Sequence, residues 1–199
     1  MFYEPANGHG LPHNPFKAIV APRPIGWIST RSAEGIANLA PYSFFNAVSD
    51  TPPIVMFSSS GRKDSLHNAE ETGEFVCNHV SEAQFKAMSQ TSYAYESGVS
   101  EFAASGLEEA DCRVVRAPRV AGAPAALECV VTEIIRPRDR EGRHCDNWVV
   151  FGEVVGVHID DAMLTDEGRF DFEKAKPVTR LGYLDYGMTP PVVTLARPK

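Results

Sequence analysis

One short stretch, Ser58-Ser-Ser-Gly-Arg-Lys-Asp-Ser-Leu-His-Asn68, brings together hydroxyl groups, a glycine and two adjacent cations. The apolar run Pro53-Ile-Val-Met-Phe-Ser58 before it has the length of a buried strand. A helix is expected to begin at Asp64, a good N-cap residue, and to end at Gly73. Serine hydroxyls, Arg62 and Lys63 would then lie beside the free N–H groups of a helix start, a combination that suits phosphate.

Asp64 limits this interpretation, because a capping carboxylate occupies helix N–H groups and adds a negative charge. A bound phosphate should therefore depend on the serines and the cations more than on the helix end. The alternative is a solvated serine-rich turn followed by a surface helix. A Walker A loop is excluded, since the Gly-x4-Gly-Lys-Ser/Thr spacing is absent.

Composition narrows the class of protein. The 199 residues suffice for a single domain over 1–199, with an irregular arm over 1–16 and a tail over 187–199. The net charge of −7, with basic residues scattered among acidic ones, argues against nucleic-acid binding. There is neither a signal-peptide pattern nor an apolar run long enough to span a membrane, so we expect a soluble, cytoplasmic protein.

The cysteines and histidines do not suggest a metal centre. The four cysteines lie far apart in the sequence and form no Cys-x-x-Cys pair, which disfavours zinc-ribbon and thioredoxin folds. Reduced, mostly buried thiols are expected. His9 and His13 are four residues apart, but Gly10 and Pro12 prevent the helix that would align them. No metal site is predicted.

The remaining elements are mainly strands. The two longest are expected over Ala126–Arg136 and Asn147–Asp160, joined by a charged hairpin loop. Both are apolar on both faces, so one face should fill a barrel while helices or a second subunit cover the other. Further strands are expected over 18–30, 36–48 (bent at Pro41) and 74–80, and helices over 82–90 and 101–104. The pattern predicts a mainly β barrel with few helices.

Several motifs occur in an order that resembles the flavin reductase-like FMN-binding split-barrel family. They are Arg23-Pro-Ile-Gly-Trp-Ile-Ser-Thr30, Gly35-Ile-Ala-Asn-Leu-Ala-Pro-Tyr-Ser-Phe-Phe-Asn46, Ser58 through Asn68, Ala126-Leu-Glu-Cys129, Gly152-Glu-Val-Val-Gly-Val-His158 and Arg180-Leu-Gly-Tyr183. The likeness covers about residues 16–186. It implies a six-stranded split barrel and a homodimer that binds flavin near the subunit interface.

The resemblance also implies a set of cofactor-binding residues. Ser29 and Thr30 are expected at the edge of the isoalloxazine ring, and Asn38, Ala40, Tyr42 and Ser43 along its wall. The phosphate is expected at Ser58, Arg62, Lys63 and Ser65, the same stretch that the residue types indicate. Arg180 and Tyr183 are further candidates, although many relatives have a second glycine at the position of Tyr183.

The sequence therefore predicts an FMN-binding flavoprotein, with FAD as a possible substitute. Its expected activity is NAD(P)H-dependent reduction of flavin or of a small acceptor, with a partner oxygenase as one candidate recipient of the reduced flavin. In such proteins the flavin carries out the hydride chemistry, so no catalytic side chain is assigned. Two alternatives stay open: a flavin carrier or electron-transfer protein without turnover, and a barrel that binds no flavin.

Overall fold

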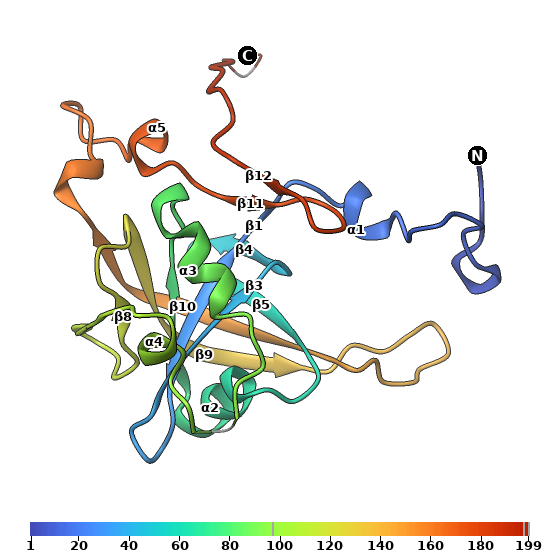
Figure 1. Cartoon of the computed structure of the whole chain (residues 1–199), viewed down its shortest axis with the longest axis horizontal. Coiled ribbons are helices and arrows are strands. Elements are labelled where there is room, and N and C mark those ends of the chain that lie inside the picture. The colour runs from blue at the N-terminus through green and yellow to red at the C-terminus, as the bar shows by residue number, and fades with distance from the viewer. Residues whose placement is uncertain (97, 197, 199) are drawn as a thin grey trace.

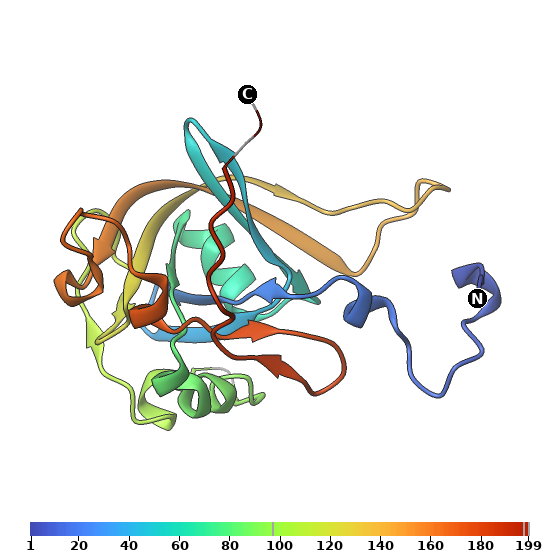
Figure 2. The same ribbon diagram turned by 90° about the horizontal axis from the view of Figure 1, so that it is seen from above.

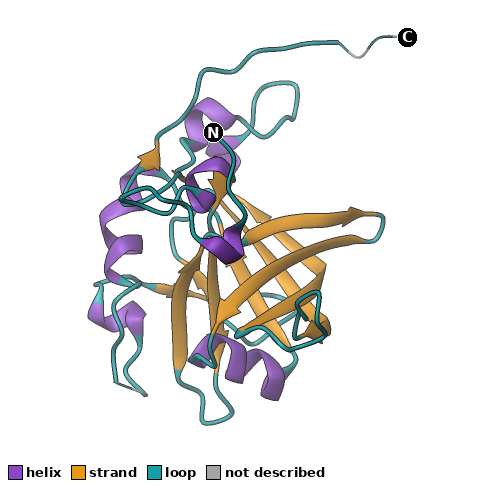
Figure 3. Ribbon diagram, turned by 90° about the vertical axis from the view of Figure 1, so that its right-hand side faces the viewer, coloured by secondary structure: helices purple, strands orange, loops and turns teal. Residues whose placement is uncertain are grey.

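A curled sheet forms the centre of the protein (Figure 1, Figure 3), and the computed structural model describes residues 1–96, 98–196 and 198. All neighbouring strands are antiparallel, in the order β3-β2-β6-β9-β10-β5-β4. The strands are β2 (Gly26–Arg31), β3 (Ala37–Tyr42), β4 (Phe45–Asp50), β5 (Pro53–Ser60), β6 (Glu74–Asn78), β9 (Ala125–Ile135) and β10 (Asn147–Ile159). The mainly β half-barrel agrees with the predicted fold class.

The two edges of this sheet follow one another in the chain. β3 pairs with β2 at one edge, and β4 pairs with β5 at the other. The bend between them, at Ser43 and Phe44, is held by a hydrogen bond from the Ser58 N–H to the Phe44 carbonyl (2.8 Å). The expected bent strand over 36–48 is thus two strands with different partners. For this reason the sheet has seven strands rather than the six expected.

Smaller elements surround the half-barrel (Figure 2). The helices are α1 (Phe16–Ile19), α2 (Asp64–Thr72), α3 (Phe85–Gln90), α4 (Glu101–Ala104) and α5 (Phe172–Ala175), with 3-10 turns η1 (Pro5–Asn7), η2 (Glu82–Gln84) and η3 (Asp161–Met163). A second sheet has the order β1-β11-β12, and β7 pairs with β8. These short strands are β1 (Arg23–Pro24), β7 (Glu109–Ala110), β8 (Arg119–Val120), β11 (Thr179–Arg180) and β12 (Tyr186–Gly187).

Helix α2 covers the lower end of the half-barrel (Figure 3). Its buried face includes Leu66 and Ala69, which pack with Phe57 and Phe75 of the strands. The helix ends where Gly73 adopts the left-handed conformation (φ 72°) that glycine accommodates without steric cost. This packing fixes the start of α2 against the sheet.

Three further expectations differ from the structure. Residues 18–30 form α1, β1 and β2 instead of one strand, because Pro22 and Pro24 lack the N–H groups that a continuous ladder needs. The expected helix over 82–90 begins as the 3-10 turn η2 before α3. Asp64 is the first helical residue and not the cap; the cap position belongs to Lys63, whose side chain makes no capping hydrogen bond.

The long strands β9 and β10 are covered on one face only within this chain. Val150 and Cys129 are fully buried, whereas Val130 is 42% exposed and Val157 is 60% exposed. Gly152 in β10 allows the close approach of Phe75, since a Cβ atom there would lie 2.4 Å from its ring. The inner face therefore fills the half-barrel, and the outer face keeps an apolar surface.

Candidate functional site

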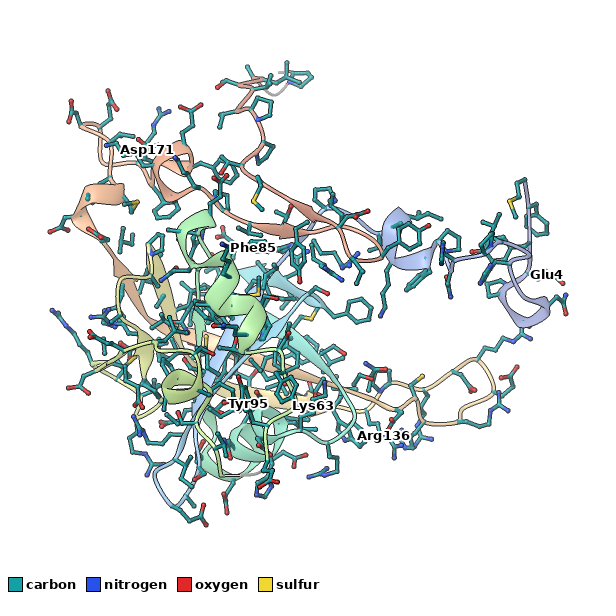
Figure 4. All side chains as sticks on the ribbon, viewed as in Figure 1. Glu4, Lys63, Phe85, Tyr95, Arg136 and Asp171 are labelled. Atoms are coloured by element: carbon teal, nitrogen blue, oxygen red, sulfur yellow. The ribbon has the colours of Figure 1, made fainter. Side chains whose placement is uncertain are left out.

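A groove of about 570 Å³ runs along the free edge of β3. One wall consists of β5 and the start of α2, and the other consists of the segment after α3 together with α4. Its lining includes seven of the predicted residues, namely Asn38, Ala40, Tyr42, Ser43, Ser58, Lys63 and Ser65. Lys63, before α2, and Tyr95, in the segment after α3, both line the groove and are labelled close together in Figure 4. The volume lies within the roughly 300–1,000 Å³ typical of small-molecule sites.

The turn between β5 and α2 supplies hydroxyl groups and a cation to this groove. Gly61 has φ 76° and donates its N–H to the Asp146 carbonyl (3.0 Å), so the chain reverses tightly before the helix. Ser58 accepts a hydrogen bond from the Asn147 amide (3.3 Å). Ser58, Ser60, Lys63 and Ser65 all line the groove. Their donors could bind an oxyanion together.

Arg62 is turned away from this groove. Its guanidinium forms an ion pair with Glu70 and lies 5.7 Å from the ring centroid of Trp148. It is not among the lining residues. Of the two adjacent cations only Lys63 lines the groove, because the extended backbone of Lys63 separates the directions of the two side chains; the phosphate role of both stays a prediction.

Ser29 and Thr30 lie behind the wall and not at its surface. Both are fully buried. Ser29 donates to the Pro118 carbonyl, and Thr30 accepts from the Asn68 amide (3.0 Å). These hydrogen bonds use the two hydroxyls to hold β2 to its neighbours, and neither residue lines the groove; contact of their hydroxyl or backbone groups with the isoalloxazine edge stays a prediction.

A buried polar network supports the wall from behind. Ser65 donates to the side-chain Oδ1 of Asn38 (2.7 Å), and the side-chain Nδ2 of Asn38 donates to Glu101 (2.9 Å). Glu101 also accepts from the Leu39 N–H (2.9 Å). Burial raises the pKa of Glu101 despite these donors, and Asp64 nearby raises it further. The network fixes α2 and α4 to the edge of β3.

The same edge keeps backbone groups available to a ligand. β3 is the terminal strand of the sheet, so one row of its N–H and C=O groups has no neighbouring strand among the described residues. In this row the Leu39 N–H already donates to Glu101 and Pro41 has no N–H, so the groups left to a ligand are mainly carbonyl oxygens. Tyr42 closes the floor: its side chain is buried, its ring lies 4.9 Å from that of Phe57, and burial raises its pKa. Backbone groups of this kind suit a planar heterocycle with donors and acceptors on its rim.

Arg180 and Tyr183 lie outside the groove. Arg180 donates to the Tyr183 carbonyl (2.5 Å) and lies 4.3 Å from the ring centroid of Tyr186. Tyr183 has a positive φ of 54°, is 51% exposed and packs edge-on against His13. Neither residue lines the groove in this chain, and a contact of either with the cofactor stays a prediction.

Sequence reasoning missed several lining residues. Lys17, Asn147 and Glu101 line the groove, as does the segment Thr91–Tyr95. Only Glu101 had a local signal, since it begins a helix that the sequence predicts. The others come from segments far apart in the chain, and the fold alone brings them together.

One further cluster has residue types that can bind metals. Cys112, Glu128 and His158 offer ligand atoms within 4.8 Å of one another. The Glu128 carboxylate already accepts from the N–H groups of Arg113, Val114 and Val115, and His158 Nε2 lies 2.6 Å from it. Glu128 is therefore best understood as an anchor for the segment after β7.

No helix among the described residues is long and apolar enough to cross a membrane.

Comparisons with known proteins agree with this geometry. The family described as "Flavin reductase like domain" matches residues 20–183. An uncharacterised protein from Aquifex aeolicus is 39% identical over 169 residues, which is 82% of this chain and 83% of that protein. The chain belongs to the flavin reductase-like family.

Two solved structures extend the comparison. Nitrilotriacetate monooxygenase component B from Bacillus cereus superposes with a TM-score of 0.87 at 29% identity, covering 98% of both chains. 2-Nitrobenzoate 2-nitroreductase from Pseudomonas fluorescens superposes with a TM-score of 0.81 at 30% identity, covering 92% of this chain and 88% of that one. Both similarities extend over the half-barrel and its surrounding elements.

Proposed function

We propose that the groove along β3 binds FMN and that the protein is an NAD(P)H-dependent reductase. The observation that carries the proposal is the groove itself, which joins a hydroxyl-and-lysine turn to a free strand edge. Ser58, Ser60, Lys63 and Ser65 would hold the phosphate. The backbone of β3 from Asn38 to Tyr42 would meet the polar rim of the isoalloxazine ring.

The residues present fit this cofactor in chemistry as well as in volume. Phosphate needs several donors and a positive charge, and the turn offers hydroxyls with Lys63. An isoalloxazine ring needs a flat apolar surface with donors and acceptors along one edge, which Ala40, Pro41 and the edge backbone provide. FAD could replace FMN if its adenylate extended into solvent from the open groove.

When bound, the flavin supplies the hydride chemistry. The chain's own contribution is to orient it: Glu101 accepts from the Asn38 amide and the Leu39 N–H, which fixes this part of β3 and α4 to each other. Tyr93 and Tyr95 pack edge-on, 5.0 Å apart, and both line the groove. They offer an aromatic surface against which a nicotinamide ring could stack.

Support for the reductase activity comes from the family and from two relatives. One of the similar proteins is component B of a monooxygenase, and another is a nitroreductase. Reduced flavin could accordingly be passed to a partner oxygenase or used on a small acceptor at the same site. Comparing the rates of flavin reduction by NADH and by NADPH decides which nucleotide the protein uses.

The first experiment is the visible spectrum of the freshly purified protein, with identification of any flavin that heat releases. We expect FMN, or a colourless protein that quenches the fluorescence of added FMN at micromolar concentrations. A colourless protein that neither quenches nor retains added FMN would contradict the proposal and favour a barrel that binds no flavin.

A further inference from the structure

A second cation besides Lys63 lines the groove. Lys17, on α1, lines the groove beside Phe44, and its Nζ lies 5.9 Å from the centroid of the Phe44 ring. The guanidinium of Arg23 lies at the same distance from that ring. Two positive charges therefore flank one aromatic side chain of the site.

Lys17 is held on an anchored segment. Arg23 donates hydrogen bonds to the carbonyls of Lys17 and Val20, and to that of Leu181 in the turn after β11 (2.7 Å). Gly182 of the same turn packs so closely on Ala18 that a Cβ atom would lie 2.3 Å from the Ala18 Cβ. Figures 1 and 2 both show α1 beside the β11–β12 hairpin. The position of Lys17 thus follows from tight packing and not from a free arm.

The positive charge beside Phe44 is not neutralised by the protein. Arg23 is 7% exposed, and its pKa is lowered by burial and by the neighbouring Arg180. Within the described residues, neither these two arginines nor Lys17 forms an ion pair with a carboxylate. This is notable in a chain with a net charge of −7. An uncompensated cluster of cations beside a groove favours an anionic ligand.

The Phe44 part of the groove adjoins the serine turn, since the Ser58 N–H donates to the Phe44 carbonyl (2.8 Å). Lys17 and Lys63 nevertheless come from different elements, α1 and the turn before α2, and both line the groove. Lys63 is followed directly by Asp64, which also lines the groove, whereas Lys17 lies over the Phe44 ring. The groove therefore offers a second cation in addition to the lysine assigned to the flavin phosphate.

We propose that Lys17 is a specificity-determining residue that binds an anionic group on the second substrate, the molecule that exchanges electrons with the flavin. The group is a carboxylate, sulfonate or phosphate attached to a planar ring that packs on Phe44. This inference rests on the proposed function, because it assigns the substrate class of the same groove.

The test compares Lys17→Gln with a matched control, Lys86→Gln, which removes an exposed lysine of α3 outside the groove. The acceptors are 1,4-naphthoquinone-2-sulfonate and the neutral 2-methyl-1,4-naphthoquinone. In both assays, quinone, NADH and a proton give hydroquinone and NAD⁺. We expect Lys17→Gln to lower the ratio of kcat/KM for the sulfonate to that for the neutral quinone about three- to tenfold. Lys86→Gln should leave this ratio unchanged.

A binding measurement provides a readout independent of turnover. Calorimetry on the FMN-loaded protein should show that Lys17→Gln weakens the binding of naphthalene-2-sulfonate by a similar factor. The binding of 2-naphthol should not change. Anaerobic reduction by NADH, followed separately, tells whether the anion that Lys17 binds belongs to the nicotinamide nucleotide or to the acceptor. A rise of the apparent dissociation constant for NADH alone assigns it to the nucleotide phosphates.

Three results would overturn the inference. The first is a Lys17→Gln variant with an unchanged kcat/KM ratio for the two quinones, unchanged affinities for the two naphthalene ligands and an unchanged dissociation constant for NADH. This result would show that Lys17 binds no substrate anion. A loss of FMN affinity without a loss of riboflavin affinity in Lys17→Gln would place Lys17 at the cofactor phosphate instead. Failure of the wild-type protein to bind any flavin would reject the proposed function itself, and is distinguished by the flavin titration made first.

Discussion

Replacing Lys63 by alanine should weaken the binding of FMN and leave the binding of riboflavin nearly unaffected. Lys63 is the cation that lines the groove at the serine turn, and riboflavin differs from FMN only by lacking the phosphate. Arg62→Ala is the matched control, because the neighbouring guanidinium is paired with Glu70 and lies over Trp148. The pair of variants therefore separates a phosphate contact from the general charge of the turn.

The magnitude follows from the exposure of the contact. A charge-assisted hydrogen bond contributes about 1.5–3 kcal/mol when it is well shielded. Lys63 is an exposed residue, so the lower end applies, and about 1.4 kcal/mol corresponds to a tenfold change in the dissociation constant. We expect FMN to bind Lys63→Ala about tenfold more weakly, and Arg62→Ala less than threefold more weakly.

Quenching of flavin fluorescence measures both dissociation constants under the same conditions. The difference between FMN and riboflavin should shrink as salt is raised from about 0.01 M to 0.15 M, because the Debye length falls from about 30 Å to 8 Å. Equal losses for both flavins in Lys63→Ala would remove the phosphate from this turn. A larger FMN loss in Arg62→Ala than in Lys63→Ala would show that the assignment of the two cations is reversed.

Three further predictions concern stability and assembly. Burial alone would raise the pKa of Glu128, but the backbone N–H donors and His158 lower it to about 2, so Glu128→Gln should lower the free energy of unfolding by about 3 kcal/mol at neutral pH. Since the folded-state pKa is the lower one, this contribution is present above about pH 4.5 and is lost as the pH falls towards 2; a urea titration that shows no difference between variant and wild type at pH 7 would contradict it. Gly152→Ala should cost about 1–3 kcal/mol in the same assay through collision with Phe75, and wild-type stability in that variant would disprove the close approach. The exposed apolar face of β9 and β10, including Val130 and Val157, should be buried in a homodimer, so light scattering at micromolar concentration should give about twice the chain mass, and the mass of one chain would contradict this.

Local patterns were sufficient to predict the long elements. The two longest strands occur within a residue or two of the predicted boundaries, because continuous apolar runs bounded by a charged loop leave few alternatives. The helix after the serine stretch was also predicted, since Gly73 supplies its C-terminal end. The prediction of a single strand through the proline-rich segment before Trp27 was wrong, because a short run gives no local sign of which strand it will pair with.

The site was predictable only in part. Lys63, Ser58 and Ser65 could be selected because hydroxyls and a cation occur together at one turn. The direction of Arg62 depends on Glu70 and on Trp148, which lies on a distant strand, so sequence order could not distinguish it from Lys63. Lys17 reaches the groove only because Arg23 joins α1 to the turn after β11, a contact between residues 158 positions apart.

The measurement that tests the central claim most directly is the anaerobic reduction of the FMN-loaded protein. Excess NADH or NADPH is mixed with the protein in a stopped-flow instrument, and the oxidised flavin band near 450 nm is followed against free FMN at about the same concentration. Close alignment of the nicotinamide and flavin rings should make reduction by at least one nucleotide much faster on the protein than in solution. A rate no greater than that of free FMN with both nucleotides, while the flavin is shown to be bound, would contradict the reductase and leave a flavin carrier.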